Sequence, residues 1–319
     1  MERKSSMDLP GAAGLTAFAV ALAFNQVVIK LTNAGFGPVF GAGLRSLLAL
    51  AVLSLWVVMR RRRMGNLTAT LWPGLLLGSL FGLEFIFLFK ALDMTSVSRA
   101  SILFYSMPVW LAVVAHLTLP GERLSLRRTA GLGLAMAGVA WALADPQSRA
   151  GGDLLGDLLA LCACWCWAGI ALTVRLSKVS QLPAEGQLFW QLAVSSVILL
   201  CVAPLMGPLI RTPDWISYSA LGYGVLVASM GFLFWLWLMT IYPASDIASF
   251  SFLSPVLAVV FGWLIFAEPV GPQFILALGL VAVGIVLINR RKRPSPLAEP
   301  AGPEGLASAG RDTGSLKSD

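Results

Sequence analysis

Residues 71–92 read LWPGLLLGSLFGLEFIFLFKAL, and this stretch decides the kind of fold that the chain can adopt. It holds one carboxylate, Glu84, and one ammonium group, Lys90, among side chains that are otherwise apolar or small. A helix needs about 20 residues of this character to cross the hydrocarbon core of a bilayer. Residues 71–92 are therefore predicted to form a transmembrane helix.

Nine other stretches have the same apolar character. Only 12% of the 319 residues are charged, whereas a soluble domain carries about 25%. Backbone groups in lipid must bond within their own segment, so each stretch is predicted to be helical. The predicted fold is an all-α membrane protein of ten transmembrane helices, at residues 12–31, 38–59, 71–92, 98–119, 128–144, 155–177, 184–205, 216–241, 245–266 and 272–289.

Lysine and arginine are distributed unevenly between the two ends of these helices, and cytoplasmic loops carry the excess. One end has Lys30, Lys90, Arg99, Arg149 and Arg211, whereas the other has the larger set Arg3, Lys4, 60–63, Arg123, Arg127, Arg128, Arg175, Lys178 and 290–293. Both termini are therefore predicted to be cytoplasmic. Because these basic groups border apolar segments, we attribute the net charge of +7 to membrane orientation and expect no nucleic-acid partner.

The sequence repeats itself at an offset of nearly half its length. An offset of 146 relates Glu122 to Glu268, Gly133 to Gly279 and Gly138 to Gly284, and an offset of 147 relates Pro108 to Pro255 and Ser98 to Ser245. Each copy holds five helices, and because five is odd the second copy enters the membrane from the opposite face. The prediction is two inverted five-helix repeats, an arrangement of alternating-access carriers with the substrate site near the midplane.

Several short motifs carry a resemblance to a known family. The first copy contains TSVS (95–98), MPV (107–109) and GERLS (121–125), and the second contains LSPV (253–256) and FAEP (266–269). In this order and spacing they resemble EamA-type transporters of the drug/metabolite transporter superfamily, over about residues 12–290. Leu22 departs from the pattern, since the family often has tryptophan there. The resemblance implies ten helices and export or exchange of amino acids, related metabolites or drugs.

The expected organisation follows from the repeat and the resemblance. Residues 1–11 form a cytoplasmic N-terminus, 12–148 the first EamA repeat, 149–290 the second, and 291–319 a disordered cytoplasmic tail rich in Pro, Gly, Ser and Ala. The expected location is the bacterial inner membrane, with a small-molecule substrate and the lipid bilayer as partners. A monomer is expected.

Two polar residues fall near the predicted midplane. An intramembrane charge costs at least about 2.5–3.5 kcal/mol, so Glu84 is a candidate site for a substrate amine or a proton. The alternative is a structural ion pair with Arg45, Lys90 or Arg99. Asn25, in the first helix, is a candidate for substrate contact, although a buried amide can also join helices.

Pro108 and Pro255 fall near the middle of the fourth and ninth predicted helices. Proline donates no amide hydrogen bond, so both positions are candidate hinges, with passive bending as the alternative. Residues with hydroxyl groups near these bends are candidate substrate contacts, namely Ser101, Tyr105, Ser249 and Ser251. Trp165 and Trp235 are further candidates for lining the site, with packing as the alternative. Gly74, Gly78 and Gly82 recur every fourth residue, which favours close helix packing.

The sequence argues against other classes of function. An enzyme active site within a membrane needs paired carboxylates, a metal motif or a nucleophile with its base, and no such pattern is visible. His116 is the single histidine, and Cys162, Cys164 and Cys166 point to nearly opposite helix faces at alternate steps. We therefore expect no metal, no cofactor and no catalysis. A channel or receptor is the remaining alternative to a carrier.

Overall fold

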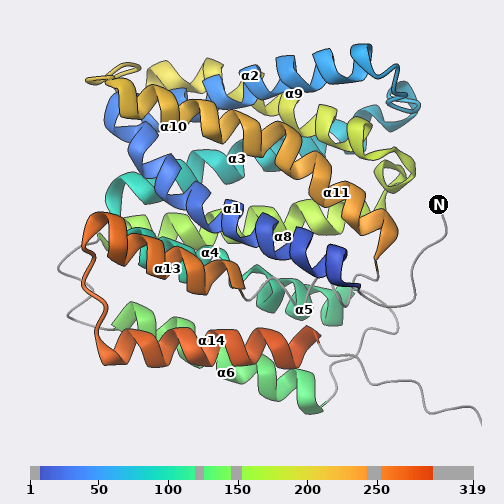
Figure 1. Ribbon diagram of the computed structural model, residues 1–319. Helices are drawn as coiled ribbons and strands as arrows, with labels where there is room; N and C mark the ends of the chain where they lie inside the picture. Colours follow the sequence, from blue (N-terminus) through green and yellow to red (C-terminus); the bar gives the residue numbers. More distant parts are fainter. Residues whose placement is uncertain (1–7, 119–125, 145–152, 243–252, 290–319) are drawn as a thin grey trace, which may run out of the picture. The chain divides into compact units, whose positions relative to one another are not determined.

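The computed structural model describes residues 8–118, 126–144, 153–242 and 253–289, and these ranges are almost entirely helical (Figure 1). An isolated antiparallel bridge joins Phe36 to Ile210, and no strand occurs in the ranges just given. Residues up to Asn289 belong to one compact unit. The predicted tail over 291–319 lies outside the described residues.

The helices of the first half match the predicted segments closely, except in the fourth. They are α1 (Leu9–Gly35), α2 (Pro38–Met59), α3 (Leu71–Met94), α4 (Val97–Phe104), α5 (Met107–Thr118) and α6 (Leu126–Ala144). Those of the second half are α8 (Leu154–Leu176), α9 (Ala184–Val202), α10 (Trp215–Leu226), α11 (Phe232–Ile241), α13 (Leu253–Phe266) and α14 (Pro272–Asn289). Short 3₁₀ turns lie at Thr68–Thr70, Lys178–Gln181 and Ala203–Leu205.

Within the residues that the structure describes, seven helices are long and apolar enough to cross a membrane. Three shorter apolar helices, at Thr129–Trp141, Leu253–Phe266 and Pro272–Leu287, fall where the fifth, ninth and tenth spanning helices were predicted. The protein is therefore an all-α, multi-pass membrane protein, as the sequence predicts.

Two predicted helices are not regular along their length, and this corrects the sequence analysis. The segment expected to run unbroken over 98–119 divides at Tyr105 and Ser106 into α4 and α5. Pro108 is the second residue of α5, where a missing amide hydrogen costs little. The Ser106 hydroxyl donates to Leu103 O at 2.6 Å, which satisfies one carbonyl at the break. The segment expected over 216–241 contains a π-helical turn at Val227–Gly231, between α10 and α11.

Polar side chains fix several helix starts. Asp214 precedes α10 and accepts from the Ser217 amide at 2.8 Å and the Ser217 hydroxyl at 2.6 Å. These hydrogen bonds lower the pKa of Asp214, and the bond from the Ser217 hydroxyl has the larger effect. The carboxylate therefore caps the helix over a wide pH range. Asp153 caps α8 in the same way through the Leu155 amide, at 3.1 Å.

Helices from the two halves of the chain pack against each other. Extensive contacts join α2 to α9, α6 to α14, α3 to α8, α1 to α10, α1 to α13 and α4 to α8. Figure 1 shows α6 and α14 side by side. Glycines permit this approach, because a Cβ at Gly138 would lie 2.7 Å from Ala277 O and one at Gly284 would lie 2.5 Å from Gly131 O.

The two opposite ends of the bundle differ in their charged residues. The arginine-rich end contains residues 60–63, where Arg62 lies 3.7 Å from Glu185. The Lys30 end contains the α1–α2, α3–α4 and α13–α14 connections. There Arg211 donates to both Asp93 oxygens, at 2.6 and 2.7 Å, and to Asn33 O at 2.9 Å. The hydrogen bonds that Arg211 donates to Asp93 raise the pKa of Arg211, so the guanidinium stays charged.

Candidate functional site

Eight residues on α1–α4 have buried side-chain atoms without a hydrogen-bond partner among the described residues, and five of them are considered as site residues. We call these five the unpartnered polar residues. Their unpartnered atoms are Asn25 Oδ1, Gln26 Oε1, Arg45 Nε and Nη2, Glu84 Oε2 and Ser101 Oγ. A buried polar atom left unsatisfied costs about 1–3 kcal/mol. Buried polar atoms of this kind in a membrane protein are candidates for bonds to polar groups of a bound molecule.

Arg45 is held between aromatic rings and a glycine. Its side chain is 2% exposed, and its guanidinium carbon lies 3.7 Å from the ring centre of Phe85 and 5.2 Å from that of Phe89. A Cβ at Gly224 on α10 would lie 3.3 Å from Arg45 Cδ. Cation–π attraction therefore orients the guanidinium, while two of its nitrogens keep no partner.

Glu84 lies in the middle of α3 and is 4% exposed. Of the three cations considered from sequence, Arg45 is the one that interacts with it electrostatically. Lys90 instead donates to Met206 O at 3.3 Å, and Arg99 pairs with Asp157. Arg45 and Glu84 do not form an ion pair within 4.0 Å, so the structural pair considered as the alternative is not a direct one.

Tyr105 joins α4 to α1 beside the unpartnered polar residues. Its hydroxyl donates to Leu22 O at 3.1 Å and accepts from Gln26 Nε2 at 3.4 Å. Ser101 precedes Tyr105 by four residues and so lies on the same side of α4. Trp167 of α8 packs edge-on against the Tyr105 ring, with centroids 6.0 Å apart.

The structure separates the two candidate tryptophans. Trp165 is 49% exposed and contacts Trp110, with ring centroids 5.3 Å apart, so it lies on the outer face of α8 and not among the unpartnered polar residues. Trp235 is half-buried and stacks on Phe18 at 6.2 Å. From there a chain of ring contacts passes through Phe232 and Phe81 to Phe85, which contacts Arg45.

The remaining candidates have mixed positions. Ser249 and Ser251 lie outside the described residues. Pro255 is buried and is the third residue of α13, and Pro108 is half-buried at the start of α5. Within the described ranges, no three His, Cys, Asp or Glu side chains gather as metal ligands would. Arg45, considered from sequence as a partner of Glu84, is buried within α2.

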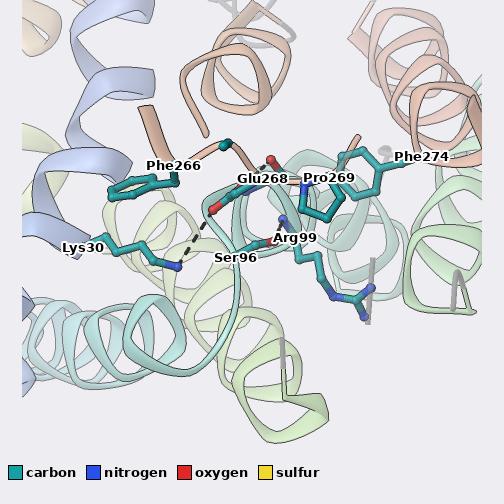
Figure 2. A pocket seen from close by; sticks show the side chains of 9 residues that line it. Lys30, Ser96, Arg99, Phe266, Glu268, Pro269 and Phe274 are labelled. Carbon is teal, nitrogen blue, oxygen red and sulfur yellow. Dashed lines mark hydrogen bonds and ion pairs between the residues drawn. The ribbon is translucent and has the colours of Figure 1, made fainter. Parts of the chain in front are cut away.

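A cavity of about 340 Å³ lies at the Lys30 end (Figure 2). Its polar lining includes Lys30, Ser96, Ser98, Arg99 and Glu268, and Phe266 and Phe274 supply apolar walls. Glu268, identified from sequence only as a marker of the repeat, is 7% exposed and faces this cavity. Lys30, which lines the cavity, lies one helical turn beyond Gln26 on α1.

A buried ion pair anchors α4 beside this cavity. Asp157 of α8 accepts from Arg99 Nε at 3.1 Å through each of its oxygens, and Arg99 Nη2 makes a further contact with it. The Thr95 hydroxyl donates to Asp157 at 2.9 Å. Both charged side chains are almost completely buried, so α4 is fixed to α8 at its first turn.

Comparison with known proteins gives a consistent family. The EamA-like transporter family matches residues 9–144 and 154–290. A relative named "Uncharacterized transporter YoaV", from Bacillus subtilis (strain 168), is 24% identical, and the match covers 88% of this chain and 98% of the relative. A relative named "Probable amino-acid metabolite efflux pump", from Escherichia coli (strain K12), is 28% identical over 84% of this chain and 91% of its own. A solved crystal structure, 19% identical, shares the fold with a TM-score of 0.61 and covers 87% of this chain and 98% of its own.

Proposed function

The chain belongs to the EamA-like transporter family, and from this premise we propose that it is a carrier of the bacterial inner membrane that exports a small zwitterionic metabolite by alternating access. The substrate binds among the unpartnered polar residues, with Tyr105 beside them. No catalytic step is involved.

Inverted architecture is the first part of this proposal. We infer ten spanning helices, with the three shorter apolar helices counted beside the seven long ones. Pro108 of α5 corresponds to Pro255 of α13, so exchanging corresponding helices of the two halves turns the α1–α13 pair into α8–α5. The same exchange turns the α3–α8 pair into α10–α1, and all four pairs are in contact. The pairs α2–α9 and α6–α14 map onto themselves. This pattern supports two inverted repeats, over 12–148 and 149–290, with the site between them.

The proposed orientation places both termini and the arginine-rich end in the cytoplasm, because lysine and arginine gather there. The Lys30 end then faces outward. Residues 1–11 and 291–319 are cytoplasmic in this arrangement, and the protein acts as a monomer in the bilayer.

One observation carries the proposed substrate class: Arg45 and Glu84 are buried opposite charges that do not bond each other directly. If Arg45 and Glu84 bonded each other directly, Arg45 Nε and Nη2 and Glu84 Oε2 would have partners, but these atoms have none among the described residues. A carboxylate can bond the guanidinium, and an ammonium group on the same molecule can bond Glu84. Such a molecule is an amino-acid-like zwitterion, which also agrees with the name of the Escherichia coli relative.

The ring chain from Trp235 to Phe85 adds a preference for apolar side chains. These rings form a continuous aromatic series that ends on the guanidinium of Arg45. Burying an apolar side chain against them stabilises binding by about 25 cal/mol for each Å² removed from water. Amino acids with larger apolar side chains are therefore the expected substrates.

Binding to the purified protein tests this assignment with matched ligands. An apolar amino acid is compared with its deaminated acid and with its decarboxylated amine. Glu84→Gln should remove the preference for the amino acid over the deaminated acid, and Arg45→Met should remove the preference over the amine. Glu185→Gln, at the arginine-rich end, is the control and should change neither. Unchanged preferences in well-folded variants at both positions would overturn the substrate assignment.

A further inference from the structure

The first turn of α4 is completed by a residue from the other half of the chain. Glu268 accepts from the Val97 amide at 2.7 Å, from the Ser98 amide at 2.9 Å and from the Ser98 hydroxyl at 2.6 Å. Helix starts leave amide groups without partners, and carboxylates are stabilised there by the helix dipole. Glu268 therefore closes the gap between α13 and α4 with three charge-assisted hydrogen bonds.

The backbone after α13 is shaped to aim Glu268 at α4. Ala267 has a positive φ of 50°, which reverses the chain at the end of the helix, and the Glu268 amide donates to Gly262 O at 3.4 Å. Gly262 leaves the space that the carboxylate fills. A Cβ there would lie 2.5 Å from Glu268 Oε2 and 2.9 Å from Ser98 Oγ.

A second partner for the same carboxylate stands on α1. Lys30 Nζ lies 3.9 Å from Glu268 Oε1, and it donates to Thr95 O at 2.9 Å (Figure 2). The cavity of about 340 Å³ lies among these groups, so the carboxylate has room to turn toward Lys30. A buried carboxylate can leave its bonds only where other partners replace them, and Lys30 can supply such a partner.

The helix that Glu268 holds is short and bears candidate substrate contacts. α4 ends at Phe104, where the chain breaks before α5, so α4 can move separately from α5. It carries Ser98 at its start, Ser101 one turn further and Tyr105 at the break. Arg99 and Asp157 fix α4 to α8, so a movement of α4 away from α13 would carry α8 with it and would widen the cavity at Ser98.

We propose that Glu268 is the latch of the Lys30 end. In the closed state it bonds the first turn of α4, and in the open state it bonds Lys30. This proposal rests on the proposed alternating-access function, and it adds the residues that close one side. Ser98 stabilises the closed state only. Lys30 lies 3.9 Å from the Glu268 carboxylate in the closed state and becomes its main partner in the open state. Gly262 provides the space that the closed state requires.

The test measures opening without any substrate. A single reporter cysteine replaces Ser101 in a chain whose four native cysteines are alanine, and an impermeant thiol reagent is added on the side of the Lys30 end. Ser98→Ala removes one bond of the closed state and should raise the labelling rate about tenfold, the equilibrium effect of one hydrogen bond to a charged group. Gly262→Ala should also raise it. Lys30→Met should lower it, and Lys30→Arg should restore it.

Controls separate the latch from misfolding and from the proposed function. Glu185→Gln lies at the arginine-rich end and should leave labelling unchanged. Each variant must elute as a single species in size-exclusion chromatography. If Lys30→Arg restores labelling, the effect of Lys30→Met is due to the lost charge and not to misfolding. Shifts of the same sign in Ser98→Ala and Lys30→Met, or no shift in either, would overturn the latch whatever the binding experiment gives. Opposite shifts in a protein that binds no amino acid would support the latch and refute the proposed substrate.

Discussion

Asp157→Asn should strongly destabilise the protein. The carboxylate is fully buried, and it bonds Arg99 through both oxygens and Thr95 through one. Asparagine keeps the shape and an acceptor for Thr95, but it takes the negative charge from beside the buried guanidinium. Breaking a buried pair in this way costs about 3–5 kcal/mol. For a chain of this size the loss corresponds to a fall in the unfolding midpoint on the order of 10 °C.

Thermal unfolding of the detergent-solubilised protein, followed by tryptophan fluorescence, measures this effect. Asp153→Asn is the matched control, since asparagine caps a helix as well as aspartate does, and its midpoint should stay close to that of the wild type. The double change Arg99→Met with Asp157→Asn removes both charges and should recover a large part of the loss. A midpoint for Asp157→Asn within about 1 °C of wild type would refute the reasoning, as would a double variant no better than the single one.

Three further predictions concern packing, topology and the prolines. Gly78→Ala should destabilise by about 1–3 kcal/mol, because its Cβ would lie 2.4 Å from Trp190 O, whereas Gly82→Ala, with 3.5 Å to its nearest neighbour, should be tolerated in the same unfolding assay. A reporter active only in the cytoplasm should give signal when fused after Met64 and none after Gly207; the reverse pattern would contradict the proposed orientation. Pro108→Ala and Pro255→Ala should shift the labelling of a cysteine at Ser101 in opposite directions, because the two helices are inverted copies; equal shifts would leave the prolines as static bends.

The fold could be predicted from hydropathy, because a lipid bilayer requires long apolar segments and requires them to be helical. A run such as residues 71–92 can satisfy its backbone in a bilayer only as a helix, so the all-α membrane fold was predicted from the sequence and is confirmed. The division of the fourth helix was not predicted. Pro108 indicated a bend, but whether the chain bends or breaks depends on neighbours such as Ser106, whose hydroxyl bonds Leu103 O.

The site was harder to predict than the fold, because helix faces in a membrane protein are apolar on both sides. The exposed position of Trp165 could not be read from its spacing, since lipid and protein interior select the same side chains. Arg45 was weighed as a structural residue because its recurrence in the family pattern suits a structural role as well as attraction of a carboxylate; its contact with Phe85 on α3 is visible only in the structure. Glu84 was identified correctly as a buried charge, since an acid in the middle of an apolar helix needs a compensating group; its part in binding stays a prediction.

Solute counterflow in proteoliposomes tests the central claim most directly. Vesicles are loaded with a high concentration of an apolar amino acid, diluted, and given a trace of the labelled compound outside. A carrier exchanges the unlabelled amino acid inside for the labelled one outside, so the label inside the vesicles should rise transiently above its equilibrium level and then fall. Glu84→Gln should abolish this overshoot. Entry that rises only to equilibrium, with no overshoot at any loading, would contradict alternating access and indicate a channel.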